Sequence, residues 1–315
     1  MLAQVVRSGL IEAVHDGAIA VADPEGVITH TFGDADRVFF LRSAAKPFQA
    51  EVTLALGGPL TPEEIAIICA SHGGDPVQIA YVEKILDEAG LSESDLATPP
   101  AWPESNRAAA RLTARGHTRP RPLWHNCSGK HAGMLRACVA QGWPTSGYTD
   151  PGHPIQLAIV EAMRRLMGEG VTPVGVDGCG APVFRGSARG LSSAFAALHT
   201  TDAYAPIVDA MSRFPALTSA PGHADQALAT WLGGVGKRGA EGCLALALPD
   251  RGSVAVKVWD GSSRALGAVM FSVLDQLGWI PHGSSRNLES SLVSPVLGGG
   301  RAVGTVEPLA VLERV

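Results

Sequence analysis

The sequence predicts an α/β fold of the α+β kind: an antiparallel sheet from the two termini, flanked by helices and carrying an inserted helical lobe. Three observations support this class. β-Rich runs lie near the N-terminus, alternating valines mark a strand at 253–259, and most of the chain between them has a helical pattern. At 315 residues the chain exceeds the usual domain size, but α/β enzymes of this length often form one folded unit with two lobes around a cleft.

The N-terminal strands flank a turn at Asp23-Pro24-Glu25-Gly26. Asp at the first position, Pro at the second and Gly at the fourth suit a type I turn, so residues 4–33 are expected to form an antiparallel hairpin. In the strand predicted at 253–259 every second residue is a valine. This alternation places Ala255, Lys257 and Trp259 together on the opposite, exposed face. The segment 300–312 is again strand-like.

Helices are predicted between these strands. Thr61-Pro62-Glu63-Glu64 is a capping box with Pro at the first helical position, and Asp75-Pro76 starts another helix that runs to about Ala89. Further helices are expected near 106–115, 130–141, 154–167, 204–213, 222–232 and 263–278.

Composition excludes several classes of protein. Hydrophobic residues make up 46% of the chain and charged residues 17%, enough for a large core. A net charge of -5 with scattered Lys and Arg argues against nucleic acid as a partner and favours a small-molecule substrate. No signal-peptide pattern and no run of about 18 apolar residues is present, so we expect a cytoplasmic protein without membrane contact. Five cysteines without paired spacing predict free thiols.

The first candidate catalytic motif is Ser43-Ala44-Ala45-Lys46, at the start of an expected helix. Residues three apart share a helix face, so the hydroxyl and the amine can meet, and Pro47 fits only in a first turn. A lysine activates a serine hydroxyl only if burial or a nearby cation lowers the pKa of the amine. The same spacing serves penicillin-recognising enzymes, but it also suits an N-cap serine with a solvated lysine.

Three further segments carry reactive side chains. Ser71-His72-Gly73-Gly74-Asp75 lies between two expected helices, where its glycines suit either close ligand approach or an ordinary turn. Trp124–Gly133 is the densest cluster: if a helix starts near Cys127, Lys130 is its neighbour and His131 lies one turn on. In Val176–Pro182 two glycines bracket Cys179, which suits a ligand contact better than a core.

A zinc site built on the cysteines is one interpretation of these segments. Cys127 and Cys179 are 52 positions apart (179 minus 127), and neither belongs to a C-x-x-C pair. The residues by themselves therefore favour small buried thiols over metal ligands.

Taken together, these motifs resemble the Rhizobium-type asparaginase II family, the class 3 L-asparaginases. They occur in the family's order and span nearly the whole chain. The segments that carry the resemblance are Arg42–Ala50, Ser71–Asp75, His125–Gly133, Val176–Pro182, Gly239–Gly242 and Lys257–Ala265.

The resemblance implies a fold similar to serine β-lactamases and penicillin-binding proteins. Residues 1–315 would form a single domain, with a cleft between the terminal sheet (about 1–60 and 240–315) and the helical lobe (about 61–239). It implies two Ser-Lys pairs, Ser43 with Lys46 and Ser71 with Lys257, so that the lysine of the terminal strand would point into the cleft. It also implies a homodimer.

A zinc ion held by Cys127, Lys130 and Cys179 is likewise implied, reversing the preference drawn from spacing alone. The ion would aid substrate binding rather than activate water. Only a neutral amine coordinates zinc, so this lysine would have to lose its proton.

The implied reaction is hydrolysis of the side-chain amide of L-asparagine to L-aspartate and ammonia. Ser43 would be the nucleophile and Lys46 its base, while Ser71 and Lys257 relay the proton. Candidates for binding the substrate are Arg42, His125, Asn126, His131, Asp177, Gly178 and Gly180.

One stretch, Leu217–Gln226, departs from the family's pattern and bears on the substrate range. Two other functions stay open. One is a different amidase or a β-lactam-reactive hydrolase that uses the same serine and lysine. The other is a non-catalytic zinc or amino-acid binder, which the presence of both serines and both lysines disfavours.

Overall fold

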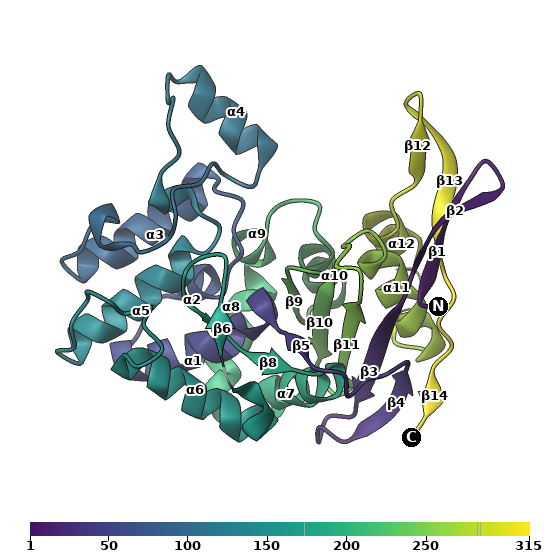
Figure 1. The fold of residues 1–315 in the computed structure, drawn as a ribbon, viewed down its shortest axis with the longest axis horizontal. Helices are drawn as coiled ribbons and strands as arrows, with labels where there is room; N and C mark the ends of the chain where they lie inside the picture. The colour runs from purple at the N-terminus through teal and green to yellow at the C-terminus, as the bar shows by residue number, and fades with distance from the viewer. Residues whose placement is uncertain (173, 282, 284) are drawn as a thin grey trace. The chain divides into compact units, whose positions relative to one another are not determined.

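The computed structural model describes residues 1–172, 174–281, 283 and 285–315, apart from the side chains of residues 169 and 285. The chain divides into two compact units, each assembled from separate stretches of sequence (Figure 1). Unit 1 comprises Met1–Ala44, Gly186–Asp202 and Gly222–Val315, and unit 2 comprises Ala45–Arg185 and Ala203–Pro221. The predicted cleft between sheet and helical lobe stays a prediction.

Unit 1 contains two antiparallel sheets, ordered β14-β4-β3-β11-β10-β9 and β12-β13-β1-β2. Both combine strands from the two ends of the chain, so the predicted fold class, helices with an antiparallel sheet from the termini, is confirmed. The strands of these sheets are β1 (Ala3–Arg7), β2 (Leu10–His15), β3 (Gly17–Ala22), β4 (Ile28–Phe32), β9 (Val235–Gly239), β10 (Cys243–Leu248), β11 (Gly252–Val258), β12 (Val296–Gly298), β13 (Arg301–Pro308) and β14 (Glu313–Arg314), and unit 1 also contains β5 (Phe39–Phe40).

The N-terminal segment forms two hairpins rather than one. The predicted turn after Asp23 is confirmed: the N–H of Gly26 donates to the carbonyl of Asp23 at 3.0 Å and joins β3 to β4. Before it, β1 and β2 form a second hairpin, because Ser8 and Gly9 have φ of 50° and 84°, as a tight two-residue turn requires. Residues 4–33 therefore supply strands to both sheets.

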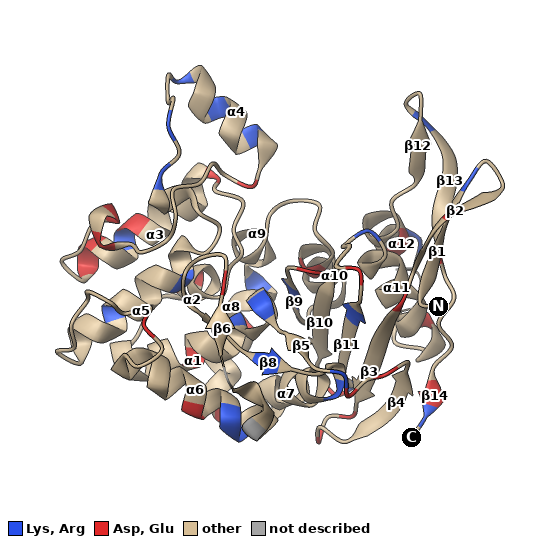
Figure 2. Cartoon of the chain, viewed as in Figure 1, with Lys and Arg blue, Asp and Glu red and all other residues tan. Residues whose placement is uncertain are grey.

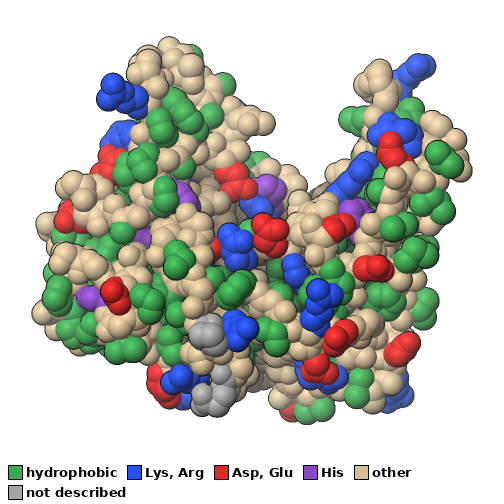
Figure 3. All heavy atoms as spheres, viewed as in Figure 1, with side chains coloured by type: hydrophobic (Ala, Val, Ile, Leu, Met, Phe, Trp, Pro, Cys, Tyr) green, Lys and Arg blue, Asp and Glu red, His purple; other side chains and the backbone are tan. Residues whose placement is uncertain are grey.

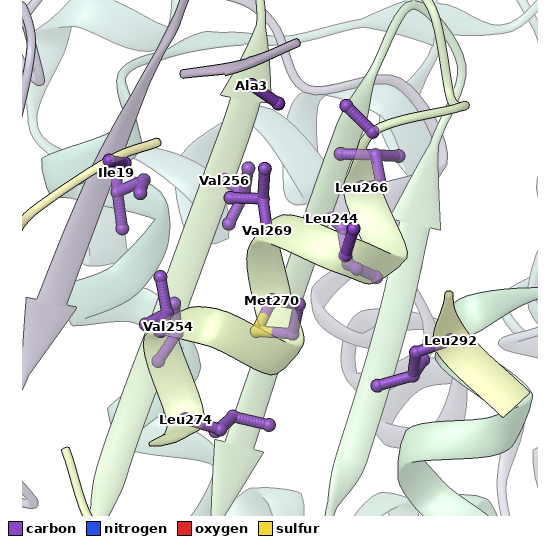
Figure 4. Close-up of a cluster of buried hydrophobic side chains, with 14 of the residues drawn as sticks. Ala3, Ile19, Leu244, Val254, Val256, Leu266, Val269, Met270, Leu274 and Leu292 are labelled. Atoms are coloured by element: carbon purple, nitrogen blue, oxygen red, sulfur yellow. The ribbon is translucent and has the colours of Figure 1, made fainter. Parts of the chain in front are cut away.

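The main core of unit 1 lies between the larger sheet and α11 (Leu266–Gln276) (Figure 4). The alternating Val254 and Val256 of β11 point to this core and contact a cluster that includes Val269 and Met270 of the helix. Burying such side chains contributes about 1.5–3 kcal/mol each. Unit 1 also contains α10 (Ala224–Leu232) and α12 (Ser285–Leu292).

The other face of the larger sheet is covered by α7 (Ala188–Thr200), a helix that the sequence pattern did not predict. The Ser192 hydroxyl of α7 lies 3.0 Å from that of Ser253 on β11. Lys257 on this face is only 6% exposed and lies beside the rings of Phe39 and Trp259, so the expectation of an exposed lysine on this strand was wrong.

Unit 2 is mainly helical, and both predicted capping boxes are present at α2 and α3. The other predicted helices, in both units, also form within a few residues of their expected bounds. The elements are α1 (Lys46–Gly57), α2 (Pro62–Ile68), α3 (Pro76–Glu88), α4 (Asn106–Ala114), α5 (Ser128–Ala140), α6 (Pro154–Met167), β6 (Gly175–Val176), β7 (Pro182–Val183), α8 (Ala205–Arg213) and α9 (Pro215–Thr218), with β8 (Arg185–Gly186) at the boundary of the units.

Close packing inside unit 2 requires glycine at one position of α5. A Cβ on Gly129 would lie 2.3 Å from the carbonyl oxygen of Ile67 in α2. Only a residue without a side chain lets the two helices approach this closely. The approach places the N-terminus of α5 beside the segment that follows α2.

Acidic and basic groups are interspersed on the face shown in Figure 3, while α4 carries only basic ones (Figure 2). All five cysteines are free, as predicted. Within the described residues, no helix combines the length and apolar character needed to cross a membrane.

Candidate active site

The centre of the candidate site in unit 2 is the amine of Lys46, which is fully buried. Its Nζ lies 3.0 Å from the hydroxyl of Ser71 and also donates to the carbonyl of Ala70. The 3₁₀ turn Arg42–Ala45 precedes the lysine, and Lys46 begins α1 with Pro47 in the first turn, as expected. The structure therefore joins Lys46 to the second predicted serine, a contact that sequence spacing did not predict.

Ser71 is held in place by the stretch whose sequence departs from the family pattern. Its N–H donates to the carbonyl of Thr218 at 2.9 Å, and Ser71 forms a parallel bridge with Ser219. Both Ser71 and Ser219 are buried. Substitutions in the stretch 217–226 can therefore alter the position of Ser71 through these backbone contacts.

Next to this serine, His72 is completely buried and bonded to α5. Its Nε2 lies 2.9 Å from the hydroxyl of Ser128, which itself donates to the carbonyl of Leu123 at 2.8 Å. Because the Ser128 hydroxyl gives its only proton to Leu123, Nε2 of His72 must donate to the Ser128 oxygen. Burial, then the nearby Lys46 and His125, lower the pKa of His72 to about 3, so the ring is neutral.

Cys127, Lys130 and Cys179 come together, although 52 positions separate the two cysteines (179 minus 127). The two thiols are hydrogen-bonded to each other, and the lysine bonds to Cys179. This bond to Cys127 and the charge of Lys130 outweigh burial and lower the pKa of Cys179 to about 5. Burial would lower the pKa of Lys130, but Cys179, Cys127 and Asp177 raise it.

These three side chains are the residues that could hold a zinc ion. Two sulfurs and one nitrogen close to one another are a donor set that zinc accepts, and three protein ligands leave one position open. Among the described residues, no group of three or more His, Cys, Asp or Glu could hold a metal ion. The third ligand would have to be the Lys130 amine, and binding would release its proton.

The turn that carries Cys179 is closed by its own backbone. The N–H of Gly180 donates to the carbonyl of Asp177 at 2.9 Å, and the N–H of Gly178 donates to the Asp177 carboxylate at 2.8 Å. Gly180 has φ of +87°, which favours glycine. Both glycines are exposed and Asp177 is half-buried, so this turn can present the carboxylate to a ligand.

Three more predicted residues surround the thiols. The N–H of Cys127 donates to His125 Nδ1 at 3.1 Å, and the Cys127 sulfur lies 3.2 Å from the amide oxygen of Asn126. The amide nitrogen of Asn126 donates in turn to Glu104 at 2.9 Å. His131 is completely buried, and burial, then Lys130, lower its pKa to about 3. Its Nδ1 lies 2.6 Å from the hydroxyl of Tyr148, a residue that no sequence motif indicated.

The remaining predicted catalytic residues belong to unit 1. Lys257 donates to the carbonyl of Glu241 and lies 5.4 Å and 5.9 Å from the ring centres of Phe39 and Trp259. Burial lowers the pKa of this lysine, as a base requires. The predicted pairing of Ser71 with Lys257, and that of Ser43 with Lys46, join residues of different units and remain predictions.

The backbone beside Ser43 is unusual. Arg42 has φ of +52°, a left-handed conformation that costs energy for any residue other than glycine. Its guanidinium lies 3.9 Å from the carboxylate of Glu241, which also has a positive φ of 62°. Such conformations concentrate at functional sites, so Glu241, to which the sequence motifs gave no role, joins the candidate residues of unit 1.

Comparisons with known proteins identify the family of the chain. A family model described as L-asparaginase II matches residues 3–308, and no curated protein matches the chain. Because the match spans nearly all of it, the chain belongs to the L-asparaginase II family.

Solved structures to which the chain is similar include two hydrolases. A β-lactamase from Mycobacterium bovis has 18% identity and a TM-score of 0.44, with 83% of this chain and 94% of that one covered. A Bacillus subtilis glutaminase in covalent complex with 5-oxo-L-norleucine has 12% identity and a TM-score of 0.42, with 88% and 93% covered. A protein named Mglu, in its tris and glutamate form, has 16% identity and a TM-score of 0.39, with 89% covered. The chain spans 64% of Mglu, less than two thirds of its length.

Proposed function

We propose that this protein is an L-asparaginase that hydrolyses the side-chain amide of L-asparagine through a serine activated by lysine. The observation that carries the proposal is the buried Lys46 amine 3.0 Å from the Ser71 hydroxyl, inside a chain of the L-asparaginase II family. A fully buried lysine bonded to a serine is costly for stability alone, and such pairs are typical of nucleophilic hydrolases.

The proposed reaction has two steps. The hydroxyl of Ser43 attacks the amide carbonyl, Lys46 accepts the hydroxyl proton, and the proton passes to the leaving nitrogen as ammonia departs. Water then attacks the acyl-enzyme ester, and L-aspartate and free Ser43 are released. Ser71 bonds to Lys46 and can relay the proton, and Lys257 would complete this relay as a second base.

The substrate's charged groups need partners of opposite sign. Asp177 is the proposed partner of the ammonium group, and Arg42 and His131 are those of the carboxylate, with His125 and Asn126 lining the same site. Backbone N–H groups near Ser43 or in the turn Asp177–Gly180 would stabilise the oxyanion. Glutamine, one methylene longer, is the closest competing substrate.

We also propose that Cys127, Lys130 and Cys179 hold a zinc ion that helps to orient the substrate. The contacts among these side chains support this set of ligands. A cytoplasmic location is proposed from the five free cysteines, and a homodimer is proposed because twofold assemblies are the commonest among such enzymes.

The decisive variants are Ser43→Ala and Lys46→Met, with Ser92→Ala as a control at an exposed serine far along the chain from the motifs. Loss of ammonia release in the first two, but not in the control, is the expected result. Incubation with a penicillin, followed by mass spectrometry, tests acylation of a serine. Turnover retained in both Ser43→Ala and Lys46→Met would exclude the mechanism.

A further inference from the structure

His131 has one nitrogen bonded and one without a partner, although the side chain is completely buried. Its Nδ1 lies 2.6 Å from the hydroxyl of Tyr148. The Tyr148 oxygen also accepts the N–H of Ala97 at 2.9 Å. Within the described part of the chain, Nε2 of His131 has no hydrogen-bond partner.

The hydrogen bonds of Tyr148 determine which nitrogen of His131 carries the proton. The tyrosine has one proton to donate, and its oxygen already accepts from Ala97. If Tyr148 donates to Nδ1 of His131, every polar group of the pair is satisfied except the Nε2–H. If Nδ1 donated instead, both the tyrosine proton and Nε2 would lack a partner. The first arrangement leaves one buried group unsatisfied rather than two, and each such group costs about 1–3 kcal/mol.

An unpartnered buried N–H is costly, so the Nε2–H of His131 calls for an acceptor from outside the chain. The charged groups that act on the His131 ring are Lys130, Cys127, Lys46 and Asp177, and two of them are lysine amines. Two amines and an N–H together favour an anionic oxygen. The proposed substrate brings one such group, its α-carboxylate.

We propose that Tyr148 is a positioning residue that holds His131 as an Nε2–H donor for the α-carboxylate of an amino-acid substrate. The choice of carboxylate rests on the proposed function. With Tyr148 present, the ring meets the carboxylate with a proton. Without the tyrosine hydroxyl, the ring can carry its proton on Nδ1 and meet the carboxylate with a lone pair.

The test begins with the ligand-free protein and needs no activity. In ¹⁵N NMR spectra of histidine-labelled protein, the wild type should show His131 as the Nε2–H tautomer, assigned by its absence in His131→Gln. Tyr148→Phe should give a mixture of tautomers or Nδ1–H. Tyr81→Phe is the matched control, because Tyr81 is a half-buried tyrosine of α3 outside this cluster. A wild-type Nδ1–H tautomer would overturn the proposal.

Binding is then tested with L-aspartate, the proposed product, and with zinc alone. L-Aspartate should shift the His131 Nε2–H signal in the wild type. In turnover, Tyr148→Phe should raise KM for L-asparagine about tenfold or more and change kcat less than about threefold, as expected for loss of a binding contact to a charged group. A shift with zinc alone and none with L-aspartate would overturn the carboxylate assignment in favour of a thiolate acceptor.

A second variant distinguishes the loss of this hydrogen bond from a general loss of stability. His131→Gln places an amide N–H near the position of Nε2 and does not depend on a tautomer. Adding Tyr148→Phe to it should cause no further rise in KM, whereas an additive rise would mean that the tyrosine acts only on stability. If L-asparagine is not hydrolysed but L-aspartate shifts His131, the proposed function fails and the carboxylate site stands. If the enzyme is active and Tyr148→Phe has an unchanged KM, only this inference fails.

Discussion

Acid should destabilise this protein through His72, and replacing this histidine should remove part of that loss. Burial, with help from Lys46 and His125, lowers the pKa of His72 to about 3 in the folded protein, against 6.5 for an ordinary histidine. Below pH 6.5 the unfolded chain takes up a proton that the folded protein does not bind. The stability contributed by neutral His72 is therefore complete above pH 6.5 and declines as the pH falls from 6.5 toward 3.

The size of the effect follows from the interval between these values. Each pH unit below 6.5 costs about 1.4 kcal/mol, so at pH 4.5 the loss through this one group is about 3 kcal/mol. That is a large share of the roughly 5–15 kcal/mol that stabilises a typical protein. His131, whose pKa is also lowered to about 3, adds a loss of its own.

His72→Gln keeps a donor near the Ser128 hydroxyl and removes the titration. The free energy of unfolding, from guanidinium titrations at pH 7 and pH 4.5, should fall by about 3 kcal/mol less in this variant than in the wild type. His117→Gln, at an exposed histidine, is the control and should lose as much as the wild type. Equal losses in His72→Gln and wild type would show that the acid sensitivity does not come from His72.

Three further predictions concern packing and metal binding. Met270→Ala, in the core of unit 1, should lower the free energy of unfolding by about 2–5 kcal/mol, and a loss below about 1 kcal/mol would contradict the packing described. Gly129→Ala should cost about 1–3 kcal/mol or more, because its Cβ would meet a backbone oxygen at 2.3 Å, whereas Gly170→Ala, which has open space, should be near neutral. Elemental analysis should find one zinc per chain, lost in Cys179→Ser and kept in Cys138→Ser; zinc kept in both would place the metal elsewhere.

Local signals in the sequence were enough to predict most elements. The capping box at Thr61 and the turn after Asp23 depend on neighbours a few residues away, and both formed as expected. Helix α7 was missed, although Ser187 caps it through the N–H of Gly190. The same helix covers the face of the sheet on which Lys257 lies, and no local pattern shows that a sheet face will be covered.

In the candidate site, too, local features were predictable from the sequence and contacts made by tertiary packing were not. The spacing of Cys127 and Lys130 on one helix was predictable, because residues three apart are neighbours. The bond between Lys46 and Ser71, 25 positions apart, and the role of Tyr148 depend on tertiary packing. Single tyrosines in turns carry no signal of their own, and only the hydrogen bonds of the folded chain single this one out.

The most direct test of the proposed function is ammonia release from L-asparagine and L-glutamine by the purified protein, with Ser43→Ala measured beside it. Release from L-asparagine should be faster than release from L-glutamine, and the variant should lose it. No release from either substrate, or equal release by Ser43→Ala, would contradict the proposal that this chain hydrolyses asparagine through a serine nucleophile.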